Sequence, residues 1–309
     1  MDVTLRCNNR CQFCNVWSQP QFDALEVENT SYGILERRLE EAWKLGCRAV
    51  CFAGAEPTLY RDLGKLVSKA HLIGYFTEII TNGIILKPDS WMKNVDAFAI
   101  SYTSGREAYE KTRGLPIHDL VKNNLEKAIE YGVKVSIFDM LNTDTLPYVD
   151  ETAEYAKKLG VKLHIFSVTE QKRMDYNTLD WNSQRPANVF SEMERIKKKY
   201  GRNIAFWREG EAFLEGISKD KDFKCQIAET TVSVKPDGTV ALPCSNFPKI
   251  SSTSEESLAQ FWDSDIASDI RKICGHFDFC EGCLHQYCNY HVSLLGQPRK
   301  AINWFLEAI

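Results

Sequence analysis

Short apolar runs alternate with longer amphipathic segments from residue 2 to about residue 168. The runs are rich in β-branched residues and read DVTLR, CRAVCFAG, FTEIITNG, VDAFAISYT, VKVSIFDML and VKLHIFSV. Segments with helical periodicity, such as YGILERRLEEAWKLG and LVKNNLEKAIEYG, lie between them. Four glycines end such segments just before the next run, as a C-terminal glycine cap does: Gly46, Gly74, Gly132 and Gly160. The pattern predicts six strands and five crossovers, and therefore a parallel sheet with helices outside it.

The number of these units indicates an incomplete barrel. Six units in about 170 residues are too few for an eight-stranded barrel, which usually needs about 250 residues. We predict the α/β fold class, with a partial (β/α)6 TIM-like barrel over residues 1–205. That range includes a polar connection at 169–187 and one more amphipathic helix around SEMERIKKKYG.

A second, smaller domain is predicted after the barrel. The stretch TTVSVKPDGTVALPC alternates apolar and polar residues on both sides of Asp237-Gly238, a dipeptide favoured in tight hairpin turns. Cysteines are frequent from there to residue 288. We expect a small Cys-rich domain over residues 220–295, followed by a C-terminal helix over residues 296–309.

Composition and charge argue against some classes of partner. The chain has 309 residues, 44% of them hydrophobic and 26% charged, and a net charge of -4. Nucleic acids and anionic membranes require clustered Lys and Arg, so this mild negative charge argues against both. No signal-peptide pattern opens the chain, and no apolar run approaches the roughly 18 residues of a membrane span. We therefore expect a cytoplasmic protein.

Eleven cysteines change this picture, because a reducing cytosol disfavours disulfides and makes grouped thiols candidate metal ligands. Three lie between residues 7 and 14, and six lie in the last third of the chain. Cys47 and Cys51 lie in an apolar stretch and are interpreted as small buried hydrophobes. The distribution predicts two separate metal centres.

The first group consists of Cys7, Cys11 and Cys14 and directly follows the first predicted strand. Loops at the carboxyl ends of strands carry the reactive site in such folds. Three thiolates suit three corners of a cubane 4Fe-4S cluster and leave one iron open to another ligand. The alternative is a structural zinc knuckle, which would need a fourth ligand close by.

The spacing C-x3-C-x2-C, with Phe13 just before the third cysteine, resembles the motif of the radical SAM enzymes. The resemblance implies that the three cysteines bind a 4Fe-4S cluster whose fourth iron chelates S-adenosylmethionine. It further implies that an electron, from a donor such as flavodoxin or ferredoxin, cleaves this cofactor to a 5'-deoxyadenosyl radical. That radical would remove a hydrogen atom from a substrate under anaerobic conditions.

A second motif, FAGAEPTL, resembles the family's Gly-Gly-Glu-Pro sequence, with Gly54, Ala55, Glu56 and Pro57 in the matching places. By this resemblance, Glu56 accepts a hydrogen bond from the amino group of the cofactor. Ala55 replaces the usual second glycine, which is acceptable where the backbone φ is negative.

The stretch ISYTSGREAYEKTRG resembles the family's strand-four segment, in which Ser-Leu-Asp precedes a loop that ends in Arg-Gly. Ser101 matches and would bond the cofactor's ribose or carboxylate, whereas Thr103 stands where Asp is common. Asn142 is a similar candidate, while His164 is interpreted as an ordinary core or surface histidine. The resemblance thus assigns these cofactor-binding residues: Phe13, Gly54, Ala55, Glu56, Ser101 and Asn142.

The second cysteine group occupies the predicted Cys-rich domain and comprises Cys225, Cys244, Cys274, Cys280, Cys283 and Cys288. The hairpin would bring the first two together, and the C-x2-C pair at 280 and 283 would chelate from a single turn. This predicts a metal site that holds either iron–sulfur or zinc.

This group is similar to the SPASM or twitch extension of radical SAM enzymes, which binds auxiliary 4Fe-4S clusters. The chain departs from that pattern, because four residues rather than five follow Cys283 and no cysteine follows Cys288. We expect one auxiliary 4Fe-4S cluster with Cys274 outside its main ligand set: Cys225, Cys244, Cys280, Cys283 and Cys288.

The functional hypothesis is a radical SAM oxidoreductase, transferase or lyase with an auxiliary cluster. Its substrate would be a peptide, a protein or a small metabolite. Two alternatives come from other classes: a non-catalytic iron–sulfur maturation or scaffold protein, and a zinc-stabilised binding module. The Gly-Ala-Glu-Pro segment argues against a mere carrier, which needs no acceptor for the amino group of a cofactor.

Overall fold

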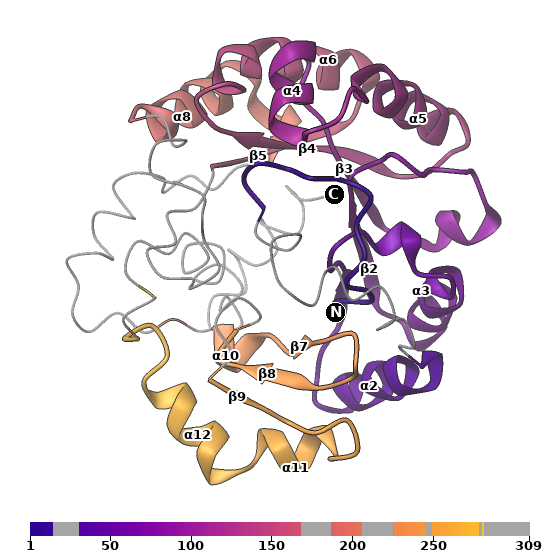
Figure 1. Ribbon diagram of the computed structural model, residues 1–309, viewed down its shortest axis with the longest axis vertical. Coiled ribbons are helices and arrows are strands. Elements are labelled where there is room, and N and C mark those ends of the chain that lie inside the picture. Colours follow the sequence, from indigo (N-terminus) through magenta and orange to yellow (C-terminus); the bar gives the residue numbers. More distant parts are fainter. Residues whose placement is uncertain are drawn as a thin grey trace.

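The computed structural model describes residues 1–14, 31–167, 187–205, 225, 227–244, 249–277 and 280. Its main feature is a parallel sheet of six strands that follow one another in chain order. The strands are β1 (Ala49–Phe52), β2 (Phe76–Thr81), β3 (Ala97–Ser101), β4 (Val135–Leu141), β5 (Lys162–Ser167) and β6 (Ile204–Ala205). Helices lie along the outside of the sheet (Figure 1). They are α2 (Tyr32–Lys44), α3 (Leu63–Ile73), α4 (Arg106–Arg113), α5 (His118–Glu130), α6 (Val149–Leu159) and α8 (Val189–Tyr200). The predicted α/β partial barrel is confirmed.

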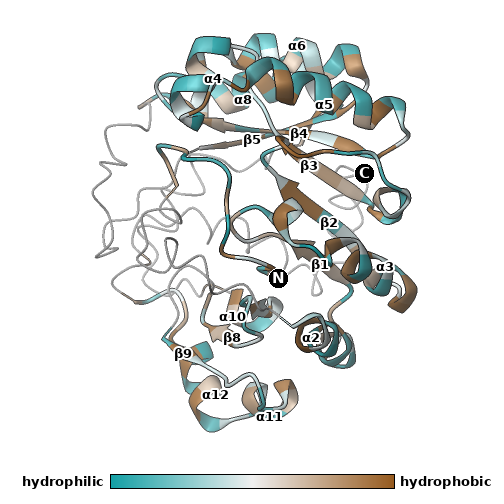
Figure 2. Cartoon of the chain, turned by 45° about the vertical axis from the view of Figure 1, so that its right-hand side comes forward, coloured by the Kyte–Doolittle hydropathy of each residue, from teal (hydrophilic) through white to brown (hydrophobic). Residues whose placement is uncertain are grey.

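The two faces of the sheet differ in exposure. Residues that point to the helices are fully buried, as in Ile79, Phe98, Ile137 and Leu163, each 0% exposed. Their neighbours along each strand point to the other, concave face and are often only half-buried. The strands β2 and β3 are mostly hydrophobic, and α4–α6 carry hydrophilic residues on their outer sides (Figure 2). The sheet therefore packs its more deeply buried face against the helices.

Positive backbone φ angles confirm the predicted helix ends. Gly74 and Gly160 cap α3 and α6 in the left-handed conformation, with φ of 106° and 70°. Gly46 and Gly132 likewise have positive φ, 102° and 89°. Each glycine lets its helix end and turn directly into the next strand.

The structure differs from the sequence prediction at both ends of the sheet. Residues 2–6 contribute only an isolated parallel bridge, between Asp2 and Ala53. The sheet instead gains β6, whose residues pair with Leu163 and His164 of β5. A strand of two residues is too short for a periodic pattern to reveal.

The C-terminal part forms a three-stranded antiparallel sheet of β7 (Ser233–Val234), β8 (Val240–Leu242) and β9 (Ile250–Ser251). Gly238 has φ 80° at the hairpin turn between β7 and β8, as the Asp-Gly dipeptide predicts. The short helices α10 (Ile227–Thr230), α11 (Leu258–Trp262) and α12 (Asp265–Lys272) accompany this sheet. It lies next to α2 (Figure 1). The amide of Asp2 donates to the carbonyl of Val234 at 2.9 Å, which ties the hairpin to the N-terminal segment.

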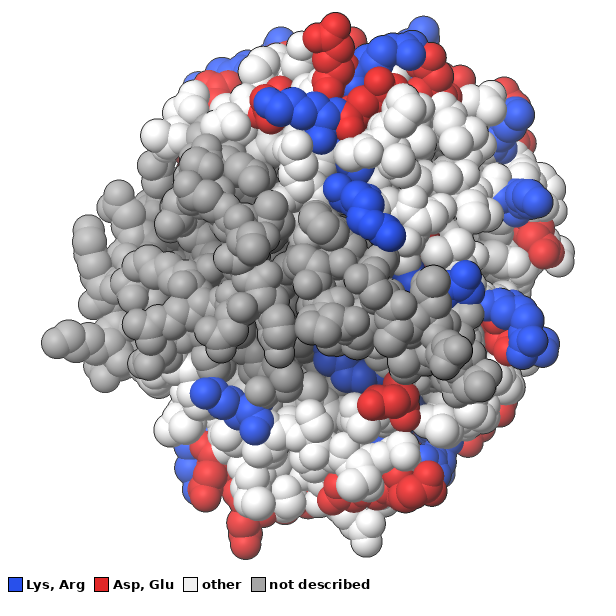
Figure 3. Space-filling model, viewed as in Figure 1, with Lys and Arg blue, Asp and Glu red and all other residues white. Residues whose placement is uncertain are grey.

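Positive and negative side chains are interspersed over the visible described surface (Figure 3). This agrees with the small net charge of -4. Among the described helices, none combines the length and apolarity that a membrane crossing needs.

Candidate functional site

The cysteine loop, residues 4–14, is held from two sides by backbone hydrogen bonds. The amide of Glu56 donates to the carbonyl of Arg6 at 2.8 Å. The amide of Gln12 donates to the carbonyl of Thr112, also at 2.8 Å. The loop therefore connects the carboxyl end of β1 to the last turn of α4, at the edge where parallel folds place their sites.

The three cysteines of this loop differ in depth. Cys11 is buried, while Cys7 and Cys14 are half-buried. Burial raises the pKa of the Cys7 thiol to about 11, although the Asn9 amide donates to its sulfur at 3.4 Å and opposes this shift. Such a thiol gives up its proton when a metal cation supplies compensating charge.

Other donors around the loop point at sulfur and suit an anionic cluster. The side-chain nitrogen of Asn82 lies 3.9 Å from Cys7 Sγ, and Nη1 of Arg113 lies 3.8 Å from Cys11 Sγ. The side-chain nitrogen of Asn9 is buried and has no hydrogen-bond partner in the described part of the chain. Hydrogen bonds to sulfur stabilise iron–sulfur clusters, so these residues fit a 4Fe-4S group. Within the described ranges, no three His, Cys, Asp or Glu side chains already converge as metal ligands.

The Gly-Ala-Glu segment after β1 has the backbone that its sequence requires. Gly54 has φ 115°, and a Cβ atom there would lie 2.7 Å from the carbonyl oxygen of Thr4. In the described part of the chain, only glycines have positive φ, so Ala55 has a negative φ. The alanine is therefore compatible with this turn.

Glu56 is 1% exposed, and four hydrogen bonds fix its carboxylate. Oε1 accepts from the amide and hydroxyl of Thr58, at 3.1 and 2.6 Å, and from the hydroxyl of Thr81 at 2.7 Å. Oε2 accepts from the amide of Asn82 at 2.8 Å. Oε1 thus accepts three hydrogen bonds from described residues and Oε2 accepts one, so Oε2 is the less engaged oxygen and can accept from a further donor.

The other predicted cofactor residues lie at strand ends. Phe13 is half-buried beneath the guanidinium of Arg113, 4.9 Å from its ring centroid. Ser101 is 7% exposed at the end of β3, and its hydroxyl has no hydrogen bond among the described residues. Asn142 follows β4, and its Oδ1 accepts from the amides at 144 and 145, both at 2.9 Å. That side chain therefore caps a local turn.

Thr103 has a carboxyl neighbour that the sequence analysis missed. Its hydroxyl donates a short hydrogen bond to Oδ1 of Asp139, on β4. Asp139 is 0% exposed, and burial raises its pKa to about 7. The sequence held a signal for this pair, since Asp139 interrupts the apolar run VKVSIFDML. Carboxylates are rarely buried without a partner, so an Asp in a buried strand indicates a specific neighbour.

The concave face carries another acid that was missed, Glu78, which is half-buried. The register pairs Cys51 of β1 with Glu78 of β2, so the thiol and the carboxylate are neighbours on one face of the sheet. Burial raises the pKa of Glu78 and raises that of Cys51 well above its usual value. His164 lies on the same face, where burial lowers its pKa to about 4. Cys47 and Cys51, predicted as small buried hydrophobes, are both half-buried, and Cys51 lies beside an acid rather than among apolar side chains alone.

The C-terminal cysteines are only partly described. Cys225 and Cys274 are buried and adjacent, because the Cys225 amide donates to the Cys274 carbonyl at 3.1 Å. Cys244 and Cys280 are half-buried. Two members of the predicted set, Cys283 and Cys288, lie outside the described residues.

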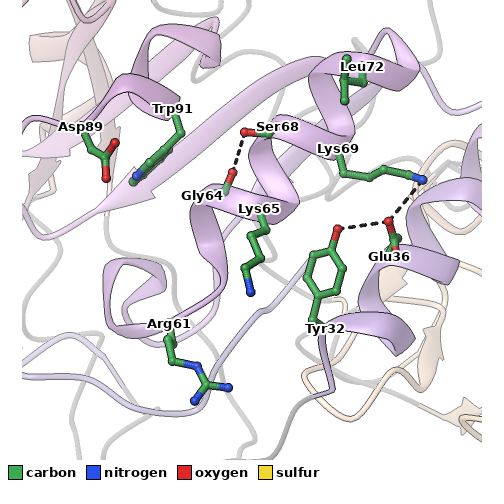
Figure 4. A pocket seen from close by; sticks show the side chains of 10 residues that line it. All are labelled: Tyr32, Glu36, Arg61, Gly64, Lys65, Ser68, Lys69, Leu72, Asp89 and Trp91. Atoms are coloured by element: carbon green, nitrogen blue, oxygen red, sulfur yellow. Dashed lines mark hydrogen bonds and ion pairs between the residues drawn. The ribbon is translucent and has the colours of Figure 1, made fainter.

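A separate hollow of about 630 Å³ lies between α2 and α3 (Figure 4). Tyr32 and Glu36 line it from α2, Lys65 and Lys69 from α3, and Trp91 from the segment after β2. Lys69 spans the two helices through its ion pair with Glu36, at 3.2 Å. None of the described cysteines lines this hollow, so it is separate from the cysteine loop.

Comparison with known proteins identifies the family. The model of the "Radical SAM superfamily" matches residues 1–168, which is more than half of the chain. The chain belongs to the radical SAM superfamily of enzymes. The matched region contains the cysteine loop, the Gly-Ala-Glu segment and strands β1–β5.

Several curated proteins are similar to this radical SAM chain in sequence. One is a GTP 3',8-cyclase from Helicobacter pylori, 28% identical over 182 residues, which are 55% of each chain. Another is an S-adenosylmethionine-dependent nucleotide dehydratase from Flammeovirga pacifica, 28% identical over 47% of this chain and 55% of that protein. The chain thus matches about half the length of these relatives.

Solved structures resemble the fold over nearly the whole chain. Streptococcus suis SuiB gives a TM-score of 0.69 at 18% identity, over 96% of this chain and 73% of SuiB. A structure of anSMEcpe with bound AdoMet gives a TM-score of 0.63 at 17% identity, over 98% and 97% of the two chains. These matches show a shared fold.

Proposed function

We propose that this radical SAM protein reductively cleaves S-adenosylmethionine and abstracts a hydrogen atom from its substrate. Cys7, Cys11 and Cys14 would hold the 4Fe-4S cluster, which supplies the electron for cleavage when it is bound and reduced. The single observation that supports this most is the convergence of donors on the cysteine sulfurs, from Asn82 and Arg113.

The chain's own residues would then bind and orient the cofactor. Glu56 would take a hydrogen bond from the amino group on Oε2, which accepts a single bond from the described residues. Ser101 would bond the ribose or carboxylate through a hydroxyl that no described residue engages. Gly54 and Ala55 would let the backbone approach closely. The concave face would help to exclude water from the reacting atoms.

For the substrate, we propose a peptide or protein. Support comes from the fold match, which extends through the C-terminal part to a SuiB structure bound to the precursor peptide SuiA. A small metabolite such as a nucleotide is the second candidate, because the curated relatives named here include a GTP cyclase and a nucleotide dehydratase. Electrons would come from flavodoxin or ferredoxin, in the cytoplasm.

We also propose an auxiliary 4Fe-4S cluster in a C-terminal domain over residues 220–295, held mainly by Cys225, Cys244, Cys280, Cys283 and Cys288. Its role would be to bind substrate or to accept an electron from the product radical. Cys274 is the next candidate ligand, because its backbone contacts that of Cys225.

The first test is anaerobic reconstitution followed by cofactor cleavage with dithionite. We expect iron and sulfide consistent with two cubane clusters, together with release of 5'-deoxyadenosine. Ala substitution of Cys7, Cys11 or Cys14 should abolish that release, whereas Cys47→Ala, outside both groups, should not. Stoichiometric zinc without iron, or cleavage by the triple Ala variant, would contradict the proposal.

The same assay separates the two clusters. A folded Cys280→Ala or Cys283→Ala variant should still release 5'-deoxyadenosine but form no product. Circular dichroism and retention of the first cluster establish folding, because loss of a metal ligand can unfold a small domain. The substrate class is tested with precursor peptides and with nucleoside triphosphates, each deuterated at carbon. The substrate is the compound that transfers deuterium to 5'-deoxyadenosine.

A further inference from the structure

Arg113, the last residue of α4, is a buried cation in contact with the cysteine loop. Its side chain is 7% exposed, and Nη1 lies 3.8 Å from Cys11 Sγ. The guanidinium also lies over two aromatic rings, 4.9 Å from the centroid of Phe13 and 5.6 Å from that of Tyr109. Cation–π contacts of this kind fix the orientation of a guanidinium.

The aromatic platform beneath Arg113 is itself held in place. The hydroxyl of Tyr109 donates to the backbone carbonyl of Ser101 at 3.0 Å, which anchors α4 to the end of β3. Gly114, directly after Arg113, ends α4 in the left-handed conformation. The guanidinium therefore has little freedom to turn away from Cys11.

The charge of Arg113 is directed at sulfur rather than at a carboxylate. Among the described residues, its hydrogen-bond acceptor is Cys11. Asp139 acts on it only through space and bonds to Thr103 instead. A buried cation is costly unless an anion compensates it, so the arrangement favours negative charge at the cysteine loop.

An iron–sulfur cluster gains one negative charge when it is reduced. A fixed positive charge stabilises the reduced form more than the oxidised form, and this raises the reduction potential. We propose that Arg113 sets the reduction potential of the cluster held by Cys7, Cys11 and Cys14, as a positioning residue that favours electron uptake. The inference rests on the proposed function of those cysteines.

The test is a potentiometric titration of the reconstituted protein, followed by electron paramagnetic resonance. The N-terminal cluster is identified as the signal that changes when S-adenosylmethionine is added. Arg113→Met removes the charge and keeps a long side chain. At a fixed solution potential, we expect the ratio of reduced to oxidised cluster to fall about tenfold, which for one electron corresponds to about 59 mV.

Two further variants separate charge from packing and from overall charge. Arg106→Met removes a cation from the exposed side of the same helix and should leave the potential unchanged, because solvent screens that group. Arg113→Lys keeps the charge, so the reduction potential of its cluster should stay close to that of the original protein. This variant tests the inference even if Arg113→Met does not bind the cluster. An unchanged potential in Arg113→Met, or an equal fall in Arg113→Lys, would overturn the inference. If neither the original protein nor any of the variants formed a cluster, the proposed function itself would fail.

Discussion

At the scale of single residues, the most unusual group is Asp139. It is 0% exposed, its Oδ1 accepts from Thr103, and its Oδ2 has no hydrogen-bond partner among the described residues. Burial raises the pKa of this carboxyl to about 7, against a hydrogen bond from Thr103 and the charge of Arg113 that lower it. Burial disfavours the charged form, so the folded protein holds a proton that the unfolded chain releases near pH 4.

This proton makes stability depend on pH. Between about pH 4 and pH 7 the folded state binds more protons than the unfolded state, so the free energy of unfolding falls as pH rises. Each unit of pKa difference corresponds to about 1.4 kcal/mol. We expect Asp139→Asn, which mimics the protonated acid, to remove this loss. Urea unfolding of the metal-free protein at pH 5 and pH 8 measures this change in the free energy of unfolding.

The control for this prediction is Asp89→Asn, at an exposed aspartate. From pH 5 to pH 8, the free energy of unfolding of the original protein and of this control should fall by a few kcal/mol more than that of Asp139→Asn. A pH dependence that is the same in all three proteins would show that Asp139 is ionised in the folded state.

At this scale the sequence indicates the proposed ligands more readily than it indicates their surroundings. Cys7, Cys11 and Cys14 are recognisable from spacing alone, because chelation by one loop requires sequence proximity. Arg113, by contrast, is 102 residues away from Cys11 along the chain. Partners of this kind come together only when the fold is known, and so do Asp139 and Glu78.

At the scale of secondary structure, helix ends were the most predictable feature. Glycine caps depend on one residue and its φ angle, so Gly74 and Gly160 are visible in the sequence. Strand pairing at the edges was less predictable. The segment at 2–6 alternates like a strand yet contributes one bridge, whereas β6 has two residues and no pattern. Edge pairing depends on neighbouring segments rather than on local sequence.

One helix end also positions the site. Gly114 ends α4 with φ 76°, and a Cβ atom there would lie 2.6 Å from the carbonyl oxygen of Arg10. Gly114→Ala should therefore push the cysteine loop away from α4, in addition to the roughly 1–2 kcal/mol cost of the left-handed backbone. We expect lower iron content and a weaker signal from the N-terminal cluster, measured by iron analysis and electron paramagnetic resonance.

Gly132→Ala is the matched control. Gly132 also has a positive φ, 89°, but its Cβ atom would meet nothing within 4 Å. Both variants should show at least the roughly 1–2 kcal/mol cost of the left-handed backbone in thermal unfolding, and only Gly114→Ala should lose iron. Equal iron content in the two would show that the loop accommodates the added methyl group.

At the scale of the whole molecule, a single buried arginine joins the barrel to the C-terminal sheet. Arg38 of α2 is 0% exposed and donates to backbone carbonyls on the other part of the chain. Nε reaches Gly238 at 2.7 Å, Nη2 reaches Thr253 at 2.9 Å, and Nη1 reaches Glu256 at 2.9 Å. Its charge is balanced by Glu41, 2.6 Å away on the same helix.

The turn of the hairpin explains why this contact is specific. Gly238 packs so closely on α2 that a Cβ atom would lie 2.0 Å from Cγ2 of Ile34. The sequence predicted the hairpin, but it could not show what the turn contacts, because Arg38 and Gly238 are 200 residues apart.

We expect Arg38→Met to loosen the C-terminal sheet from the barrel. The methionine matches much of the arginine's volume but leaves three carbonyls without a donor and Glu41 without its cation. Each unsatisfied buried group costs about 1–3 kcal/mol, so the free energy of unfolding should fall by several kcal/mol. Limited proteolysis should cut first within residues 227–277. Arg61→Met, at a side chain that is 93% exposed, should change neither measurement. If Arg38→Met resisted protease as well as Arg61→Met does, the two parts would be held together by apolar packing and by the bond between Asp2 and Val234 instead.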